Sequence, residues 1–152
     1  LSEPLAARCI AALQKPLPRV DLGLALRRAG LASSAVDVSD GLLADVGHIA
    51  VRSQLDIEVF ETQLPCLPEG ADVALARACQ LGGGDDYELA FTAPAGKRVD
   101  LAALAATLDL PLWRIGQVVA GQGVVRLFDE NGKVVMPVHR GFDHFGQDQN
   151  GQ

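Results

Sequence analysis

Residues 35–42 constrain the fold of this chain more than any other stretch, because they join a strand to a helix through a polar turn. The apolar run 35–38 predicts a short strand, and apolar residues recur at helical spacing after the Ser39-Asp40-Gly41 turn. Ser39 or Asp40 is therefore expected at the beginning of a helix. Backbone N–H groups and the helix dipole favour an anion at such a position.

Two interpretations of this turn remain open from the residues alone. Asp40 can be an ordinary helix N-cap, a contribution of about 1 kcal/mol to stability, and Ser39 can share that task. Capping does not account for Asp37, which introduces a charge into an otherwise apolar strand where aspartate is disfavoured. The alternative is a binding site for magnesium and a nucleotide.

Composition limits the class of protein. A chain of 152 residues has the size of one domain. The net charge of −6 and the pI of about 4.9 argue against partners such as nucleic acid or an anionic membrane. No apolar run approaches the ~20 residues that span a bilayer.

Three widely spaced cysteines predict free thiols and a cytoplasmic location. Leu1 in place of methionine indicates a fragment of a longer protein.

Helical and strand-like patterns alternate along the chain, and together they predict a layered α/β or α+β architecture. Asp21 is the predicted cap of the second helix, and Gly30 is its predicted C-terminal residue in the left-handed conformation. Asn131-Gly132 signals a final hairpin, which makes the predicted sheet mixed. The expected helices cover residues 2–15, 22–29, 41–52, 71–80 and 99–108, and the expected strands cover 35–38, 55–60, 85–92, 112–119, 123–128 and 133–136.

Several nucleotide-binding motifs are absent. Gly96-Lys97 lacks the context of a P-loop, and residues 82–84 do not form a dinucleotide-binding fingerprint. His48 is interpreted as a surface residue. With those motifs excluded, the candidate binding groups are carboxylates. Their hard oxygen atoms suit Mg²⁺, which binds through one or two carboxylates together with phosphate and water. These carboxylates belong to Asp37, Asp40, Asp45, Asp85, Asp86 and Glu88.

The second acidic segment also has a plain structural interpretation. Residues 82–84 can be the C-terminal cap and loop of a helix. Tyr87 and Leu89 are then core residues of a strand, while the acids between them are solvated.

Three motifs, taken together in their order along the chain, favour the interpretation as a functional site. They are residues 37–42 followed by Asp45 and His48, residues 83–89, and residues 141–145. Together they closely resemble the C-terminal domain of bacterial thiamine-monophosphate kinase, as does the entry segment 16–20. The resemblance runs from the start of the chain to about Phe145, so residues 1–145 are the expected domain and 146–152 a disordered tail.

The resemblance implies an α+β fold with α/β/α layers and a mixed sheet flanked by helices. Related domains occur in aminoimidazole-ribotide synthetase, selenophosphate synthetase and a hydrogenase-maturation protein. The family transfers the γ-phosphoryl group of ATP to thiamine phosphate. An N-terminal domain, absent from this chain, supplies much of the ATP site and the main contact of a homodimer. This fragment alone is therefore expected to be nearly inactive.

The resemblance also assigns roles to individual residues. Asp37 and Asp40 are expected to coordinate Mg²⁺ and Ser39 to contact ATP. Glu88 is expected to bind thiamine phosphate, and Phe142 its aromatic part. Phe142 departs from the Trp or Tyr that the family often has there, so stacking is retained while a polar contact from the ring is not. The implied mechanism is direct in-line transfer without a covalent intermediate.

Two other functions stay open at this stage. One is a different ATP-dependent synthetase of the same superfamily, in purine or selenophosphate synthesis. The other is a non-catalytic ligand-binding or dimerisation module. The combination of both acidic motifs argues against the first, and their retention disfavours the second.

Overall fold

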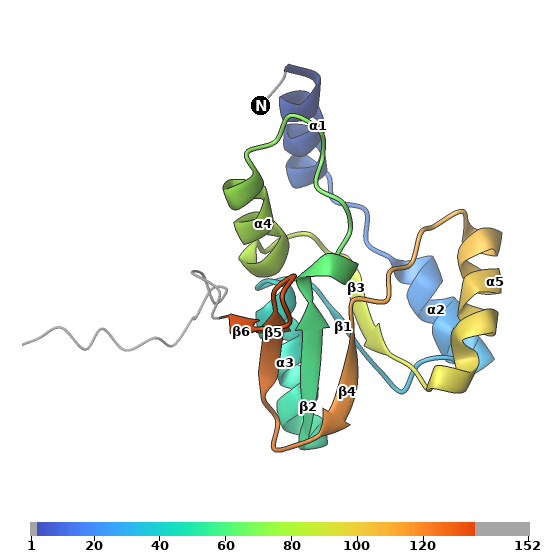
Figure 1. The fold of residues 1–152 in the computed structure, drawn as a ribbon. Helices are drawn as coiled ribbons and strands as arrows, with labels where there is room; N and C mark the ends of the chain where they lie inside the picture. Colours follow the sequence, from blue (N-terminus) through green and yellow to red (C-terminus); the bar gives the residue numbers. More distant parts are fainter. Residues whose placement is uncertain (1–2, 136–152) are drawn as a thin grey trace, which may run out of the picture.

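The structure of this chain is a computed structural model that describes residues 3–135. No helix among these residues combines the length and the hydrophobicity needed to cross a membrane. Figure 1 shows the elements in chain order. They are α1 (Glu3–Gln14), α2 (Val20–Ala29), β1 (Ser34–Asp37), α3 (Leu42–Ser53), β2 (Leu55–Phe60), η1 (Glu61–Gln63), α4 (Val73–Gly82), β3 (Leu89–Thr92), η2 (Ala95–Lys97), α5 (Arg98–Leu108), β4 (Gly116–Ala120), β5 (Val125–Phe128) and β6 (Val134–Val135).

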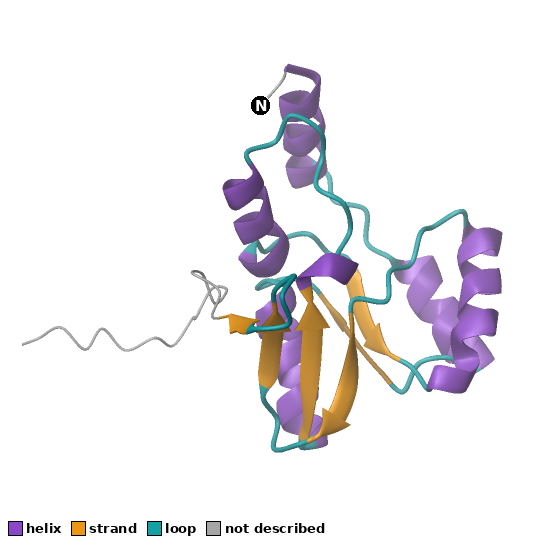
Figure 2. Ribbon diagram, viewed as in Figure 1, coloured by secondary structure: helices purple, strands orange, loops and turns teal. Residues whose placement is uncertain are grey.

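The strands form two sheets rather than one. Strands β1 and β3 pair antiparallel, and a four-stranded sheet has the order β4-β2-β5-β6. Within the larger sheet β2 runs antiparallel to β4 and parallel to β5, while β5 and β6 form the hairpin that Asn131-Gly132 predicted. Figure 2 shows the strands and the helices that flank them. The predicted α+β class with a mixed sheet is confirmed, and the division of the strands into two sheets is an addition.

Helix α3 provides the main apolar core. Its buried residues Val46, Ile49 and Ala50 belong to one cluster with Ile57 and Val59 of β2. The same cluster includes residues next to or within the smaller sheet, so α3 packs against both sheets. Each valine or isoleucine side chain among them contributes roughly 1.5–3 kcal/mol when it is fully buried. The helix that begins after the polar turn is therefore held firmly in place.

Helices α2 and α5 form a second core with β3. Leu22 and Leu26 of α2 are buried, and Leu89 and Phe91 of β3 pack against them. Side chains alternate between the two faces of a strand, so Ala90 of β3 belongs to the α3 cluster instead. The small sheet is thus covered by α3 on one face and by α2 and α5 on the other, which confirms the predicted α/β/α layers.

Some predicted element ends were wrong. Asp21 does not cap α2, because the helix begins at Val20 and its N-cap position is Arg19. Gly30 does end α2 in the left-handed conformation, with φ 60°. The expected strand 85–92 is confined to β3, because Asp85 and Tyr87 have φ of 63° and 52°, which a strand does not allow.

Asp56 connects β2 to the loop between β4 and β5. Its side chain is buried, and Oδ1 accepts hydrogen bonds from the backbone N–H groups of Gln122, Gly123 and Val124 at 2.9, 3.1 and 2.9 Å. Arg126 of β5 donates to the other oxygen. These contacts, with the Val124 hydrogen bond first, lower the pKa of Asp56 to about 2. The loop is therefore fixed by one ionised carboxylate.

We expect the charge of Asp56 to make the stability of the fold depend on acid pH. A folded-state pKa of about 2, against 3.8 for an unperturbed aspartate, stabilises the fold above pH 3.8, and this contribution is lost as the pH falls towards 2. Asp56→Asn is expected to lower the free energy of unfolding at about pH 6 more than at about pH 3. Denaturant titrations at both pH values measure this difference, with the exposed Glu130→Gln as the control. A loss of equal size at the two pH values contradicts the expectation.

Candidate functional site

The two acidic motifs lie side by side because their backbones are paired. The antiparallel ladder of β1 and β3 ends with Asp37 opposite Leu89. Beyond it, Val38 N–H donates to the Glu88 carbonyl at 2.8 Å, and Tyr87 N–H donates to the Val38 carbonyl at 2.9 Å. Asp85 N–H then donates to the Ser39 carbonyl at 2.9 Å. We call segments 37–41 and 82–89, joined in this way, the acidic platform.

Glycines permit the close approach of the two segments. A Cβ atom at Gly84 would lie 2.3 Å from the backbone oxygen of Ser39. A Cβ atom at Gly41 would lie 2.9 Å from the backbone carbon of Gly82, and Gly41 also has φ 121°, which other residues rarely adopt. Gly83 is the C-cap of α4, as the plain interpretation predicted. The glycines therefore serve both the helix end and the contact between motifs.

Asp45 organises the turn that precedes α3. It is 2% exposed, and its Oδ2 accepts hydrogen bonds from the backbone N–H groups of Ser39, Asp40 and Gly41 at 2.9, 3.1 and 3.1 Å. The N-cap residue is Gly41, without a side-chain capping bond. The interpretation of Ser39 or Asp40 as the N-cap was wrong, because the helix begins one residue later and Gly41 takes that position. Those three groups are directed at Asp45 rather than at a bound phosphate.

The two predicted metal ligands, Asp37 and Asp40, differ in exposure and in the residues around them. Asp37 is exposed at the end of β1, and Asp40 is partly buried in the turn. Asp40 lies with Asp45 and His48 in a group whose potential ligand atoms are all within 4.8 Å of one another, and this group does not include Asp37. His48 is exposed, as predicted, yet it faces the turn closely enough to belong to this group.

Glu88 has a partner that the sequence did not reveal. Arg19, at the N-cap position of α2, donates from Nε to Oε2 at 2.8 Å and from Nη2 to Oε1 at 2.5 Å. The hydrogen bond with Glu88 is the main cause that raises the pKa of Arg19. The two residues are 69 positions apart. Nothing in the local pattern around either residue indicates this contact.

Negative charge accumulates beside Glu88. Partial burial raises the pKa of Asp86 above its usual value, and the neighbouring charges of Glu88 and Asp85 raise it further. Tyr87, predicted as a core residue, is 38% exposed, whereas Leu89 packs in the second core as predicted. This edge of the platform therefore favours a cation or a positively charged ligand.

Phe142 and the rest of the predicted motif at 141–145 lie outside the described residues. The assignment of Phe142 to the aromatic part of the substrate therefore stays a prediction.

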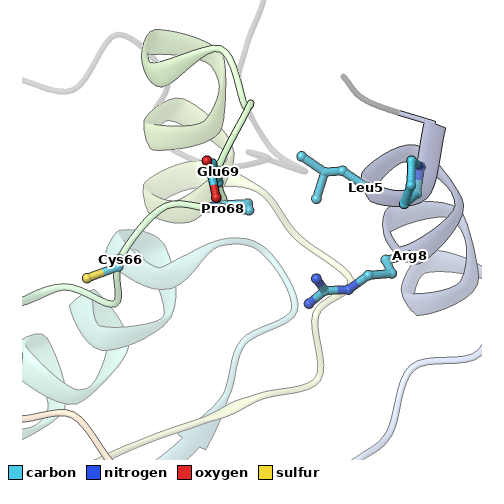
Figure 3. Close-up of a pocket in the computed structure, with 6 residues that line it drawn as sticks. Leu5, Arg8, Cys66, Pro68 and Glu69 are labelled. Atoms are coloured by element: carbon cyan, nitrogen blue, oxygen red, sulfur yellow. The ribbon is translucent and has the colours of Figure 1, made fainter.

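A hollow of about 460 Å³ lies apart from the acidic platform, between α1 and the segment that follows η1. Figure 3 shows Leu5 and Arg8 of α1 facing residues of that segment. The residues that line the hollow are Pro4, Leu5, Arg8, Cys66, Pro68 and Glu69. None of these residues belongs to the predicted site, and the exposed Cys66 is a free thiol, as are the other two cysteines.

Comparison with known protein families identifies the class of domain. Residues 7–128 match the family described as AIR synthase related protein, C-terminal domain. The match covers most of the chain, so this chain belongs to that family.

Individual relatives point to one member of the class. Thiamine-monophosphate kinase of Haemophilus influenzae is 38% identical over 136 residues, which cover 86% of this chain and 41% of the relative. The structure of thiamine-monophosphate kinase from Stenotrophomonas maltophilia K279a is 51% identical, with a TM-score of 0.73 and coverage of 82% of this chain and 39% of that one. The structure of AaThiL complexed with AMPPCP and TMP is 31% identical, with a TM-score of 0.70 and coverage of 95% and 43%.

These comparisons confirm the resemblance to thiamine-monophosphate kinase that the motifs indicated. The chain spans only about two fifths of the length of these relatives, since it covers 41%, 39% and 43% of them.

We expect Gly84→Ala to destabilise the acidic platform, because the new methyl group would lie 2.3 Å from the Ser39 carbonyl oxygen and force the two segments apart. Overpacking of this kind costs about 1–3 kcal/mol. Thermal or denaturant unfolding measures the loss. Gly96→Ala is the control, because a Cβ atom there meets nothing within 4 Å. Equal stability of the two variants contradicts the close contact.

Proposed function

We propose that this chain is the C-terminal domain of a thiamine-monophosphate kinase, which transfers the γ-phosphoryl group of ATP to thiamine phosphate and forms thiamine diphosphate. The observation that carries the proposal is the acidic platform, whose backbone pairing places Asp37, Ser39 and Asp40 beside Glu88. The names of the relatives support it, and so does the relative complexed with AMPPCP, an ATP analogue, and TMP.

The carboxylates of the platform fit Mg²⁺. Asp37 presents an exposed carboxylate at a strand end, and Asp40 lies three residues further along the same turn. Hard oxygen donors of this number suit Mg²⁺, which takes its remaining ligands from phosphate and water. Asp45 is less suited to this role, because one of its oxygens already accepts three backbone hydrogen bonds. When bound, Mg²⁺ would neutralise the negative charge of the phosphate groups.

Ser39 would contact ATP through its hydroxyl group. Its backbone N–H donates to Asp45 and its carbonyl accepts from Asp85, so both backbone groups are engaged within the domain. This bonding fixes the backbone of the turn before any ligand arrives. Preorganised groups of this kind lower the cost of positioning the reactants, which matters in a reaction that leaves little bond-making to the protein.

Glu88 would bind the organic part of thiamine phosphate. Its carboxylate repels the phosphate group but attracts the cationic thiazolium ring and accepts hydrogen bonds from an amino group. Asp85 and Asp86 add negative charge to the same edge. The phosphate would then lie away from the Glu88 carboxylate, with the Mg²⁺ that Asp37 and Asp40 would hold. Direct in-line transfer to that phosphate requires no covalent intermediate.

The proposal includes a longer protein. Since the chain covers about two fifths of its relatives, an N-terminal domain would supply the remainder of the ATP site and the main contact of a homodimer. This domain alone would then have little activity. The predicted cytoplasmic location belongs to the same proposal.

The test is to express the full-length protein and to measure thiamine diphosphate formed from thiamine phosphate and Mg·ATP. Calorimetric titration with thiamine phosphate, and separately with a Mg·ATP analogue, accompanies the assay. Saturable binding of both ligands together with turnover supports the proposal. Binding of nucleotide without any response to thiamine phosphate would replace it with a sister activity of the superfamily, and binding of neither would indicate a non-catalytic module.

We expect Asp37→Asn in the full-length protein to lower kcat by at least about 100-fold, because the Mg²⁺ that would bind the phosphates would lose a charged ligand. Asp37 is exposed, so the free energy of unfolding should change little. Steady-state kinetics and thermal unfolding measure the two effects. Asp100→Asn, an exposed carboxylate on α5 outside the platform, is the control. Unchanged kinetics in Asp37→Asn would remove this residue from the metal site.

Glu88→Ala is expected to weaken the binding of thiamine phosphate more than the binding of ATP, because the carboxylate would face the cationic part of thiamine phosphate. The KM for thiamine phosphate should rise by about 10-fold or more, while the KM for ATP stays within about twofold. Initial rates with each substrate varied in turn provide the comparison. Equal effects on the two substrates contradict the assigned role.

A further inference from the structure

We propose that Arg19 is a positioning residue for the substrate site, which acts by fixing the orientation of the Glu88 carboxylate. The inference rests on the proposed function, since it needs Glu88 to bind the substrate. It adds a residue on a different element, at the beginning of α2, to a site otherwise built from the acidic platform.

The contact between the two side chains has the geometry that orientation requires. Two neighbouring nitrogens of the Arg19 guanidinium, Nε and Nη2, each donate to a different oxygen of Glu88, at 2.8 and 2.5 Å. Such a fork fixes the plane of the carboxylate as well as its position. A single ammonium group would fix the distance but not the plane.

Both ends of this ion pair are attached to the same packed core. The carbonyl of Arg19 accepts the hydrogen bond from Gly23 N–H that begins α2. Leu22 and Leu26 of α2 then pack against Leu89, the residue that follows Glu88. The packing of α2 on β3 therefore sets the separation between the guanidinium and the carboxylate.

The ion pair is too exposed to be explained by stability alone. The side chains of Arg19 and Glu88 are 29% and 53% exposed. Exposed pairs of this kind contribute little to folding. The remaining lone pairs of the carboxylate stay available, because the fork uses one on each oxygen. Glu88 can thus hold Arg19 and still accept hydrogen bonds from a ligand.

Charge around Glu88 also gives Arg19 a role. Glu88 lies near Asp85 and Asp86; partial burial, and after it the charges of Glu88 and Asp85, raise the pKa of Asp86. Without a cation beside it, the Glu88 side chain would turn away from these carboxylates and towards solvent. Arg19 offsets that repulsion and holds Glu88 at the platform.

The experiment compares variants of the full-length protein in steady-state kinetics with thiamine phosphate and Mg·ATP varied separately. We expect Arg19→Gln to raise the KM for thiamine phosphate about 10-fold and the KM for ATP less than about twofold. Arg19→Lys keeps the charge without the fork and should fall between Arg19→Gln and wild type. Arg28→Gln, which removes an exposed arginine from the last turn of the same helix, should leave both KM values unchanged.

A double-mutant cycle separates positioning from direct binding. In the Glu88→Gln background, Arg19→Gln should add little further loss, since there is no carboxylate left to orient. Additive losses would mean that Arg19 binds the substrate itself and would overturn the proposal. Equal losses for both substrates, together with a lowered melting temperature in Arg19→Gln and Arg19→Lys, would assign Arg19 to folding and overturn it as well. Wild-type protein without activity on thiamine phosphate would instead overturn the proposed function.

Discussion

The arrangement of the candidate site depends on the backbone pairing between segments 37–41 and 82–89. Backbone hydrogen bonds of Val38 continue the pairing of β1 and β3 past the ends of the two strands. Glycines in both segments let the backbones approach so closely that a side chain at these positions would clash. Exposed carboxylates on loops usually diverge because nothing holds them together. Here the pairing gives two acidic motifs, which are more than 40 residues apart, a fixed relation to each other.

Two buried carboxylates fix loops in the same way at separate places in the fold. Asp45 accepts three consecutive backbone N–H groups at the turn before α3, and Asp56 accepts three at the loop between β4 and β5. Each side chain satisfies donors that helix and strand ends would otherwise leave unpaired. Asp45 therefore fixes the shape of the turn in the candidate site, while Asp37 and Glu88 stay exposed.

The two apolar cores support different parts of the candidate site. The α3 core holds the first motif, and the α2 core holds β3 and, through Arg19, the carboxylate of Glu88. Each of the two paired segments is thus supported by a different apolar cluster. A ligand that contacts both segments would meet groups whose positions are already set, which lowers the entropy cost of binding.

The sequence by itself determined the helices and most strands, a layered architecture with a mixed sheet, the hairpin at Asn131-Gly132 and the residues of both acidic motifs, because these follow from local periodicity, turn residues and motif order. The α+β class followed from the resemblance that those motifs carry. Only the tertiary structure decided that Gly41 is the N-cap of α3 and that Asp45 accepts the N–H groups of the turn. It also decided that the strands divide into two sheets and that Arg19 meets Glu88. Those outcomes depend on contacts between residues far apart in the chain, or on the path of the backbone through the turn. Local sequence patterns do not encode either choice.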